Sequence, residues 1–264
     1  MKRTITTVGI WVGAQLVVTL IFMIVAMIQG KDVNSILAPS LLVSDALVII
    51  LLLAMKYCGV KELFKTVPAI VLLMTMVFGL CGMTAVDLIA SSFDIPNVLA
   101  DQFEAMSKTI SGFLGICIIG PIMEEIMMRR IILKEMEKAT KSMWGGILIS
   151  AALFAVIHIN PIQVVFAMPA GIILGWIYCK TGSLLVPICL HILNNTISFI
   201  SMRIGSDSDV LSVKSTFGAV LCVVMALVVV VSVIWINRYY KAIVVPESES
   251  SDSACVINTD ETPA

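Results

Sequence analysis

Two adjacent carboxylates stand inside an apolar stretch of the chain, at Glu124 and Glu125 in the segment GPIMEEIMMRR, residues 120–130. Ionisable side chains at membrane depth are costly and rare, and they usually mark a transport path or a catalytic site. Arg129 follows Glu125 by four residues, which is the favourable order for an ion pair on one helix. Glu124 lies about 100° further around the helix and lacks that partner. Alternatively, both glutamates belong to a charged cluster at the membrane surface, with Arg129 and Arg130 reaching the cytoplasm.

The two histidines of the chain, His158 and His191, both fall at or within apolar stretches. A single buried histidine is often a hydrogen-bonded structural group. Here, however, Phe154 and His158 are four residues apart, as are His191 and Asn195, so each pair would share one face of a helix. A buried carboxylate, an imidazole and a carboxamide are the parts that hydrolysis needs, because a base activates water and donors stabilise an oxyanion.

The elements that must position these side chains are membrane-spanning helices. The chain has 264 residues, of which 59% are hydrophobic and 13% charged, whereas soluble domains carry about 25% charged residues. Its mean hydropathy is +1.04. We therefore predict an all-α, polytopic membrane protein of about eight transmembrane helices. The expected spans are 5–27, 36–55, 67–90, 109–129, 143–158, 162–179, 184–202 and 217–236.

The distribution of basic residues predicts that both termini are cytoplasmic. With the N-terminus inside, four of the 17 Lys and Arg residues fall on the outer side, namely Lys31, Lys108, Arg203 and Lys214. The other thirteen, including Arg129 and Arg130, fall on the inner side. Residues 242–264 are acidic and rich in Ser and Thr, and we expect a disordered cytoplasmic tail there, after a helical domain over 1–241.

Composition also excludes several classes of function. The net charge is −1 and the basic residues are scattered between apolar segments, so the chain lacks the basic surface that nucleic-acid binding requires. The seven cysteines have no CxxC spacing, which argues against a disulfide framework and against a thiolate metal site. The expected surroundings are a lipid bilayer, most simply a bacterial cell membrane.

Three short patterns, in order and on separate predicted helices, resemble the CPBP family of CAAX prenyl proteases and bacteriocin-processing enzymes. They are Glu-Glu-x-x-x-Arg at 124–129, Phe-x-x-x-His at 154–158 and His-x-x-x-Asn at 191–195. The intervening segments 171–178 and 181–184 are also similar to the family. The resemblance covers residues 121–195, under a third of the chain, and the first three predicted helices carry no signature.

The resemblance implies an eight-helix intramembrane endopeptidase with its protease core at about 109–202. Its catalytic residues would be Glu124, Glu125, His158, His191 and Asn195. Glu124 and His158 would activate water, while His191 and Asn195 would stabilise the oxyanion. Glu125 would support Glu124 or pair with Arg129; Arg129 and Phe154 would have supporting roles. The expected substrate is a membrane-embedded or lipidated peptide or protein.

The metal requirement stays open in this interpretation, because enzymes of this family have been described both as metalloproteases and as metal-independent glutamate proteases. We favour a metal-free mechanism with no cofactor. If zinc is bound, the ligands would be Glu124, His158 and His191. The oligomeric state is equally open.

Two other classes of function fit the same residues. One is a catalytically silent scaffold that regulates a sensor kinase or a secretion system; the other is a bacteriocin self-immunity protein or a pore that uses Glu124, Asp45 and the histidines as a proton relay. Asp45 and Asp87, inside the second and third expected spans, have no family role. Gly171 and Gly175 predict close helix packing.

One geometric difficulty accompanies the catalytic hypothesis. If the fourth span ends at Arg129, Glu124 lies near the inner end of its helix, whereas His158 lies far along the next one. The two side chains would then differ in depth by about 10 Å.

Overall fold

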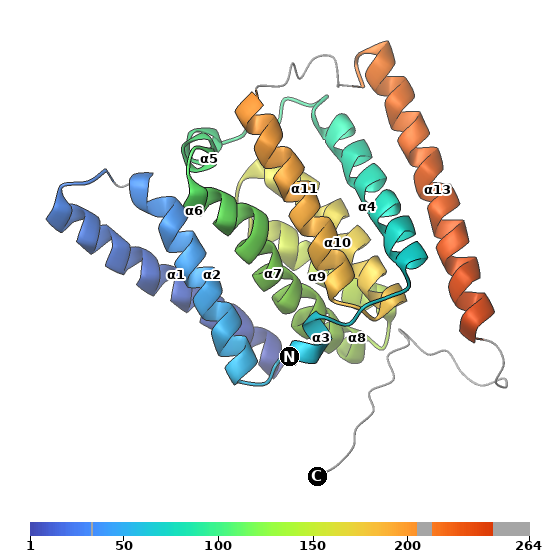
Figure 1. Ribbon diagram of the computed structural model, residues 1–264, viewed down its shortest axis with the longest axis horizontal. Helices are drawn as coiled ribbons and strands as arrows, with labels where there is room; N and C mark the ends of the chain where they lie inside the picture. Colours follow the sequence, from blue (N-terminus) through green and yellow to red (C-terminus); the bar gives the residue numbers. More distant parts are fainter. Residues whose placement is uncertain (33, 205–212, 245–264) are drawn as a thin grey trace, which may run out of the picture.

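The protein, described here from a computed structural model, is a bundle of helices (Figure 1). The structure describes all residues except 33, 205–212 and 245–264. Within this part, seven helices are long and apolar enough to cross a membrane. The helices are α1 (Lys2–Gln29), α2 (Asn34–Ala54), α3 (Val60–Leu63), α4 (Ala69–Ala90), α5 (Ala100–Ser107), α6 (Ile110–Phe113), α7 (Gly120–Glu125), α8 (Lys134–Thr140), α9 (Met143–Val156), α10 (Pro161–Thr181), α11 (Leu185–Ile204) and α13 (Thr216–Val244).

The predicted all-α membrane fold is confirmed, and each of the eight expected spans is helical. The fifth differs from prediction: α9 has only 14 residues, or about 21 Å, which is shorter than the roughly 30 Å of a bilayer core. Helix α13 reaches Val244, so the first three residues of the predicted tail are helical. The remaining tail, 245–264, lies outside the described residues, and the cytoplasmic placement of the termini stays a prediction.

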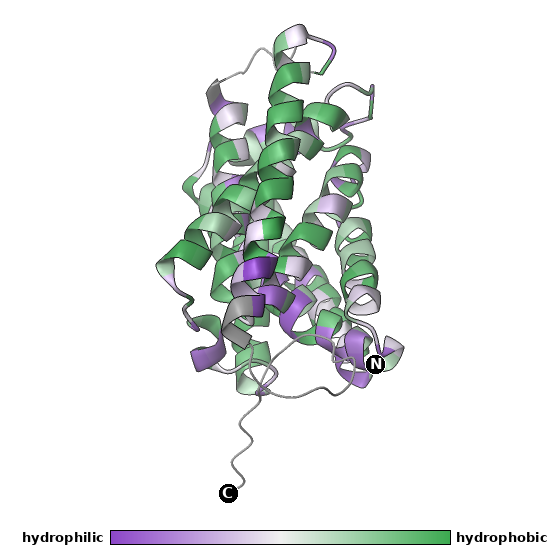
Figure 2. Cartoon of the chain, turned by 90° about the vertical axis from the view of Figure 1, so that its right-hand side faces the viewer, coloured by the Kyte–Doolittle hydropathy of each residue, from purple (hydrophilic) through white to green (hydrophobic). Residues whose placement is uncertain are grey.

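The helices pack in neighbouring pairs, with α1 against α2, α4 against α13 and α9 against α10. In Figure 1 the α1–α2 hairpin lies at one edge of the bundle and α13 at the other, with α7, α11 and α10 between them. Long apolar side chains on α1 and α13, such as Leu20 and Leu227, are exposed. Figure 2 shows apolar residues along most of the helices. These outer helices therefore present apolar faces suited to lipid.

The fourth span is a composite helix of 31 residues, Ile110–Thr140. It joins α6, a π-helix η1 (Leu114–Ile119), α7, a second π-helix η2 (Ile126–Leu133) and α8. The prediction that this span ends at Arg129 is wrong. The charged residues that suggested an end are paired: Arg129 with Glu125, Arg130 with Glu62 and Lys134 with Glu137. The helix therefore continues for eleven residues beyond Arg129.

Helix α9 returns along the composite helix after a tight turn at Lys141, which adopts a left-handed backbone conformation with φ 54°. Ser142 caps α9 by accepting a hydrogen bond from the Gly145 backbone N–H. At the far end of α9, Asn160 joins the loop after α4: its Nδ2 donates to Asn97 and its Oδ1 accepts from the Val98 backbone N–H. These bonds fix the connection between α9 and α10.

Two glycines bring α10 close to its neighbours. A Cβ atom at Gly171 would lie 3.0 Å from the Cα of Ala151, and one at Gly175 would lie 3.3 Å from Leu133. The prediction that Gly171 and Gly175 serve helix packing is therefore confirmed. The close contact holds α9, which carries Phe154, firmly against α10.

Candidate functional site

The two glutamates lie on α7, a short α-helical segment between the π-helices η1 and η2. The wider π turns arise because Gly120 N–H donates to the Gly115 carbonyl, five residues back. Pro121 has no N–H, so it cannot close the equivalent bond to the Ile116 carbonyl. That carbonyl accepts from Asn195 Nδ2 on α11 instead, at 2.9 Å. Pro121 thus frees a backbone acceptor that fastens α11 to the helix carrying the glutamates.

Glu125 and Arg129 form an ion pair in the protein interior, with both side chains 0% exposed. Arg129 Nε donates to one carboxylate oxygen at 2.8 Å and Nη2 to the other at 3.3 Å. Ser150 on α9 accepts from Arg129 Nη1 at 3.4 Å and donates to the Met128 carbonyl of η2 at 2.8 Å. Arg129 also lies over the Phe154 ring, 5.1 Å from its centroid. The structure thus contradicts the hypothesis that Glu125 and Arg129 belong to a charged cluster at the membrane surface.

His191 lies between the two glutamates. Its Nδ1 is 3.0 Å from Glu125 Oε1, and its Nε2 is 3.6 Å from Glu124 Oε2. Because the Glu125 carboxylate is held by Arg129, it is an acceptor, and Nδ1 carries the hydrogen of the imidazole. Nε2 then faces Glu124. The Glu124 side chain is 21% exposed, whereas that of Glu125 is 0% exposed, so Glu124 is the less enclosed of the two glutamates.

Phe154 joins the second histidine to this cluster. Its ring packs edge-on against His158, with centroids 4.8 Å apart, and against His191, with centroids 5.7 Å apart. His158 lies in the turn just after α9 rather than inside the helix. Its Nδ1 is 2.7 Å from the Phe154 carbonyl, which can only accept a hydrogen bond, so Nδ1 is protonated and Nε2 is the free nitrogen.

The expected difference in depth between Glu124 and His158 is wrong, and the longer fourth helix explains why. Glu124 lies 16 residues before Thr140, the last residue of α8, and His158 lies 15 residues after Met143, the first residue of α9. At 1.5 Å per residue both distances are about 23 Å from the shared turn. Glu124 and His158 therefore lie at a similar level of the bundle.

Asn195 is placed differently from the other predicted residues. The Asn195 Nδ2 group donates one hydrogen to the Ile116 backbone carbonyl. The backbone carbonyl oxygen of Asn195 accepts a hydrogen bond from the Cys117 thiol at 3.7 Å. An amide group has a second N–H, which remains for another acceptor.

Ser150 and Asp45 lie near these residues, but the sequence patterns did not identify them as site residues. Asp87 is exposed near the end of α4.

The three candidate zinc ligands do not form a metal site as they are arranged. The Nδ1 atoms of His158 and His191 are engaged, so only their Nε2 atoms would be available to a metal ion. In the described part of the chain, no group of three or more His, Cys, Asp and Glu side chains is suited to hold a metal ion. We therefore derive no step through a metal.

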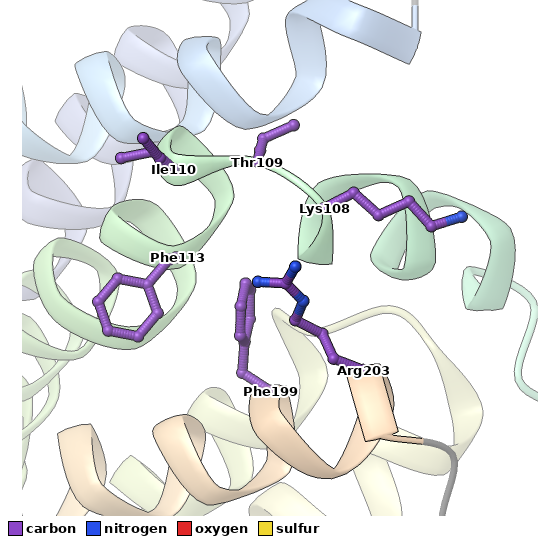
Figure 3. A pocket seen from close by; sticks show the side chains of 6 residues that line it. All are labelled: Lys108, Thr109, Ile110, Phe113, Phe199 and Arg203. Atoms are coloured by element: carbon purple, nitrogen blue, oxygen red, sulfur yellow. The ribbon is translucent and has the colours of Figure 1, made fainter.

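A cavity of about 370 Å³ lies apart from these residues, at the end of the bundle opposite the N-terminus (Figures 1 and 3). Arg203, which lines it, is twelve residues beyond His191 on α11, or about 18 Å. The rings of Phe113 and Phe199 are in contact there, with centroids 5.5 Å apart. The lining residues are Lys108, Thr109, Ile110, Phe113, Phe199 and Arg203. This cavity does not contain the predicted site.

The fold and the site define a multi-pass integral membrane protein with a buried carboxylate–histidine cluster. Comparison with known proteins agrees with the description of this chain as an integral membrane protein. Residues 106–197 match the family described as "Type II CAAX prenyl endopeptidase Rce1-like". The chain is also similar to the "Putative membrane peptidase YdiL" of Bacillus subtilis (strain 168), with 31% identity over 99 residues. That match covers 38% of this chain and 40% of the relative.

These matches confirm the resemblance found in the three patterns. The region that holds the site is similar to the CAAX prenyl endopeptidase family, and the matched residues include α7, α9, α10 and the first two-thirds of α11. The similarity spans less than half of either protein in the curated match. No solved structure matches the chain at a significant level.

Proposed function

We propose that the protein is a membrane-embedded endopeptidase that hydrolyses a peptide bond in a membrane-presented or lipidated substrate. The observation that supports this most directly is the placement of His191 between two glutamates with different surroundings. Glu125 is enclosed and paired with Arg129, whereas Glu124 is partly accessible. This difference separates a positioning carboxylate from one that can take up a proton.

In the proposed reaction, Glu124 accepts a proton from a water molecule, and the water oxygen attacks the carbonyl carbon of the scissile bond. The C–N bond then breaks, and the proton held by Glu124 passes to the leaving nitrogen. In this step His191 acts as an imidazolium, so that its Nε2 also carries a hydrogen and stabilises the charge that develops on the carbonyl oxygen, with the remaining Asn195 N–H as a second donor. His158 presents its free Nε2 to the same space and assists Glu124 in orienting the water.

Glu125 and Arg129 act in this proposal as positioning residues. Glu125 fixes the imidazole of His191 in one orientation and one tautomer, as a carboxylate does for a catalytic histidine. Arg129 keeps the Glu125 carboxylate ionised in an environment that would otherwise disfavour its charge. Ser150 and the Phe154 ring hold Arg129 in turn.

The setting of the site supports this choice of substrate class. Glu124 lies about 23 Å along its helix from the turn at Lys141, so a scissile bond must reach the interior of the bundle. A lipidated C-terminal peptide or a leader-containing peptide, such as a bacteriocin precursor, would be brought to this level by the membrane. We propose a bacterial cell membrane as this setting, since the similar membrane peptidase is from Bacillus subtilis (strain 168).

The test uses purified full-length protein in liposomes and two fluorogenic peptides of one sequence, one farnesylated and one unmodified. We expect cleavage by the parent protein and loss of about 10³-fold or more in kcat for Glu124→Gln. Glu104→Gln is the matched control, because this exposed carboxylate pairs with Lys108 away from the site. Equal cleavage by Glu124→Gln and the parent would overturn the proposal.

Two further arms of this experiment address the alternatives. Activity measured with and without a chelator reports whether a metal is required. Ion flux that depends on Glu124, in liposomes where neither peptide is cleaved, would indicate a pore instead of a peptidase.

A further inference from the structure

Ile159, which directly follows His158, has a backbone conformation that few side chains adopt. Its φ is 59°, in the left-handed region, where a β-branched residue is a clear outlier. Such a conformation is costly and persists only where the surrounding structure holds it. The Ile159 side chain is 81% exposed, so its own packing contributes little. Another group must therefore keep the chain in this conformation.

The next residue, Asn160, ties this turn to the loop after α4. Asn160 is 1% exposed, and both ends of its amide are bonded. Its Nδ2 donates to Asn97 Oδ1 at 2.8 Å, and its Oδ1 accepts from the Val98 backbone N–H at 3.1 Å. The Ile162 backbone N–H adds a third bond between the same two segments, to the Pro96 carbonyl at 3.3 Å. The turn after α9 is thus held from outside by the loop after α4.

The Asn160 side chain does not serve its own helix. Asn160 is the N-cap residue of α10, and an asparagine there usually accepts a hydrogen bond from a backbone N–H of the first turn. Asn160 makes no such bond, because its Oδ1 is directed to Val98 instead. This choice indicates that Asn160 secures the place of the turn rather than the start of α10.

The turn at Ile159 determines where His158 lies. The His158 ring is bonded through Nδ1 to the Phe154 carbonyl at 2.7 Å and packs edge-on against the Phe154 ring. Its backbone N–H bonds to the Ala155 carbonyl, three residues back rather than the four of an α-helix. If Asn160 released the chain, Ile159 would leave its unfavourable conformation, and the backbone of His158 would move with it.

We propose that Asn160 is a positioning residue that holds the strained turn at Ile159 and thereby keeps the His158 ring against Phe154. The expected effect on peptide hydrolysis rests on the proposed function. The effect on the His158 ring does not depend on that function. The loop after α4, which carries none of the predicted site residues, would then help to place one of them.

The main test is nitrogen NMR of the full-length protein in micelles with isotope-labelled histidine. The chain has only two histidines, so the signals of His158 and His191 can be assigned with His158→Gln. Asn160→Ser keeps a residue that caps helices well but lacks the amide that bonds Asn97 and Val98. We expect His158 to change from a single Nδ1-protonated tautomer to a mixture, while His191 stays as in the parent. An unchanged His158 spectrum, or equal changes at both histidines, would overturn the proposal.

Two further variants extend this test. Asn97→Ala removes one of the two bonds to the Asn160 amide and should change the His158 spectrum less; it also carries the test if Asn160→Ser does not fold. Asparagine tolerates the left-handed conformation, so Ile159→Asn should leave the His158 spectrum of the parent unchanged. In the Asn160→Ser background, Ile159→Asn should restore part of the parent spectrum, because the turn no longer needs to be held. Failure of this rescue would count against the role of strain.

The peptide assay tests the kinetic consequence. We expect Asn160→Ser to lower kcat per folded molecule about tenfold with little change in KM. In a His158→Ala background the same substitution should have no further effect, because it acts through that side chain. Equal losses in both backgrounds would overturn the positioning role. A changed His158 spectrum in a protein that cleaves neither peptide would support the positioning role and refute the peptidase.

Discussion

The buried pair of Glu125 and Arg129 leads to a quantitative prediction about Arg129→Ala. Both side chains are 0% exposed, so removal of the guanidinium leaves an ionised carboxylate without its partner in the protein interior. Breaking a buried pair in this way costs about 3–5 kcal/mol. We expect a loss of that size in the free energy of unfolding, measured by reversible unfolding in mixed micelles.

The neighbouring arginine is the control for this prediction. Arg130 pairs with Glu62 at 2.7 Å, but the two side chains are 29% and 43% exposed, and such pairs contribute about 0–1 kcal/mol. Arg130→Ala should therefore cost far less than Arg129→Ala. The double variant Glu125→Gln/Arg129→Met should recover much of the lost stability, because it leaves no unpaired charge. Equal costs for the two single arginine variants would refute the reasoning.

Three further predictions concern the surroundings of the site. Burial opposes ionisation of Glu62, but hydrogen bonds from Arg130 and from a backbone N–H outweigh this effect and lower its pKa. The ionised Glu62 should therefore stabilise the fold by under about 1 kcal/mol, fully above roughly pH 4.3 and progressively less as the pH falls further. Unfolding measured as a function of pH should show this loss in the parent but not in Glu62→Gln. Gly120→Ala should destabilise by about 1–3 kcal/mol in the same unfolding assay, since its Cβ would lie 2.7 Å from the Gly115 carbonyl oxygen. Burial raises the pKa of Cys58 to about 12, so peptide mapping should find this thiol unmodified by maleimide until the protein unfolds.

The helices could be predicted from hydropathy because each span is a long apolar run. The end of the fourth span could not, because a hydropathy scale counts each charge alone. Arg129 and Lys134 lower the apolar character of residues 129–140, yet each is compensated by an acid three or four residues away on the same helix. That error also produced the false difference in depth between Glu124 and His158.

The sequence patterns named side chains that lie close together in the structure, but most of the bonds between them could not be predicted. The spacing of Glu125 and Arg129 indicated their ion pair, which the structure contains. The bond between Asn195 and the Ile116 carbonyl was not visible, because it depends on a π turn and on the packing of α11 against η1. The approach of Asp45 to Gly120 likewise depends on how α2 packs on α7, which no local pattern records.

The positions of side chains around the composite helix make it sensitive to its length. A residue removed between Gly120 and Glu124, in the α-helical segment α7, would change the phase of the helix by about 100° between Glu124 and the residues before the deletion. With α6 held by its neighbours, Glu124 would rotate away from His191; with α7 held, Phe113 would rotate away from Phe199. A substitution in this segment alters one side chain, whereas the deletion of one residue would misalign all the side chains of the helix on one side of the deletion. Insertions and deletions are therefore tolerated far less in α7 than in the loop before α5.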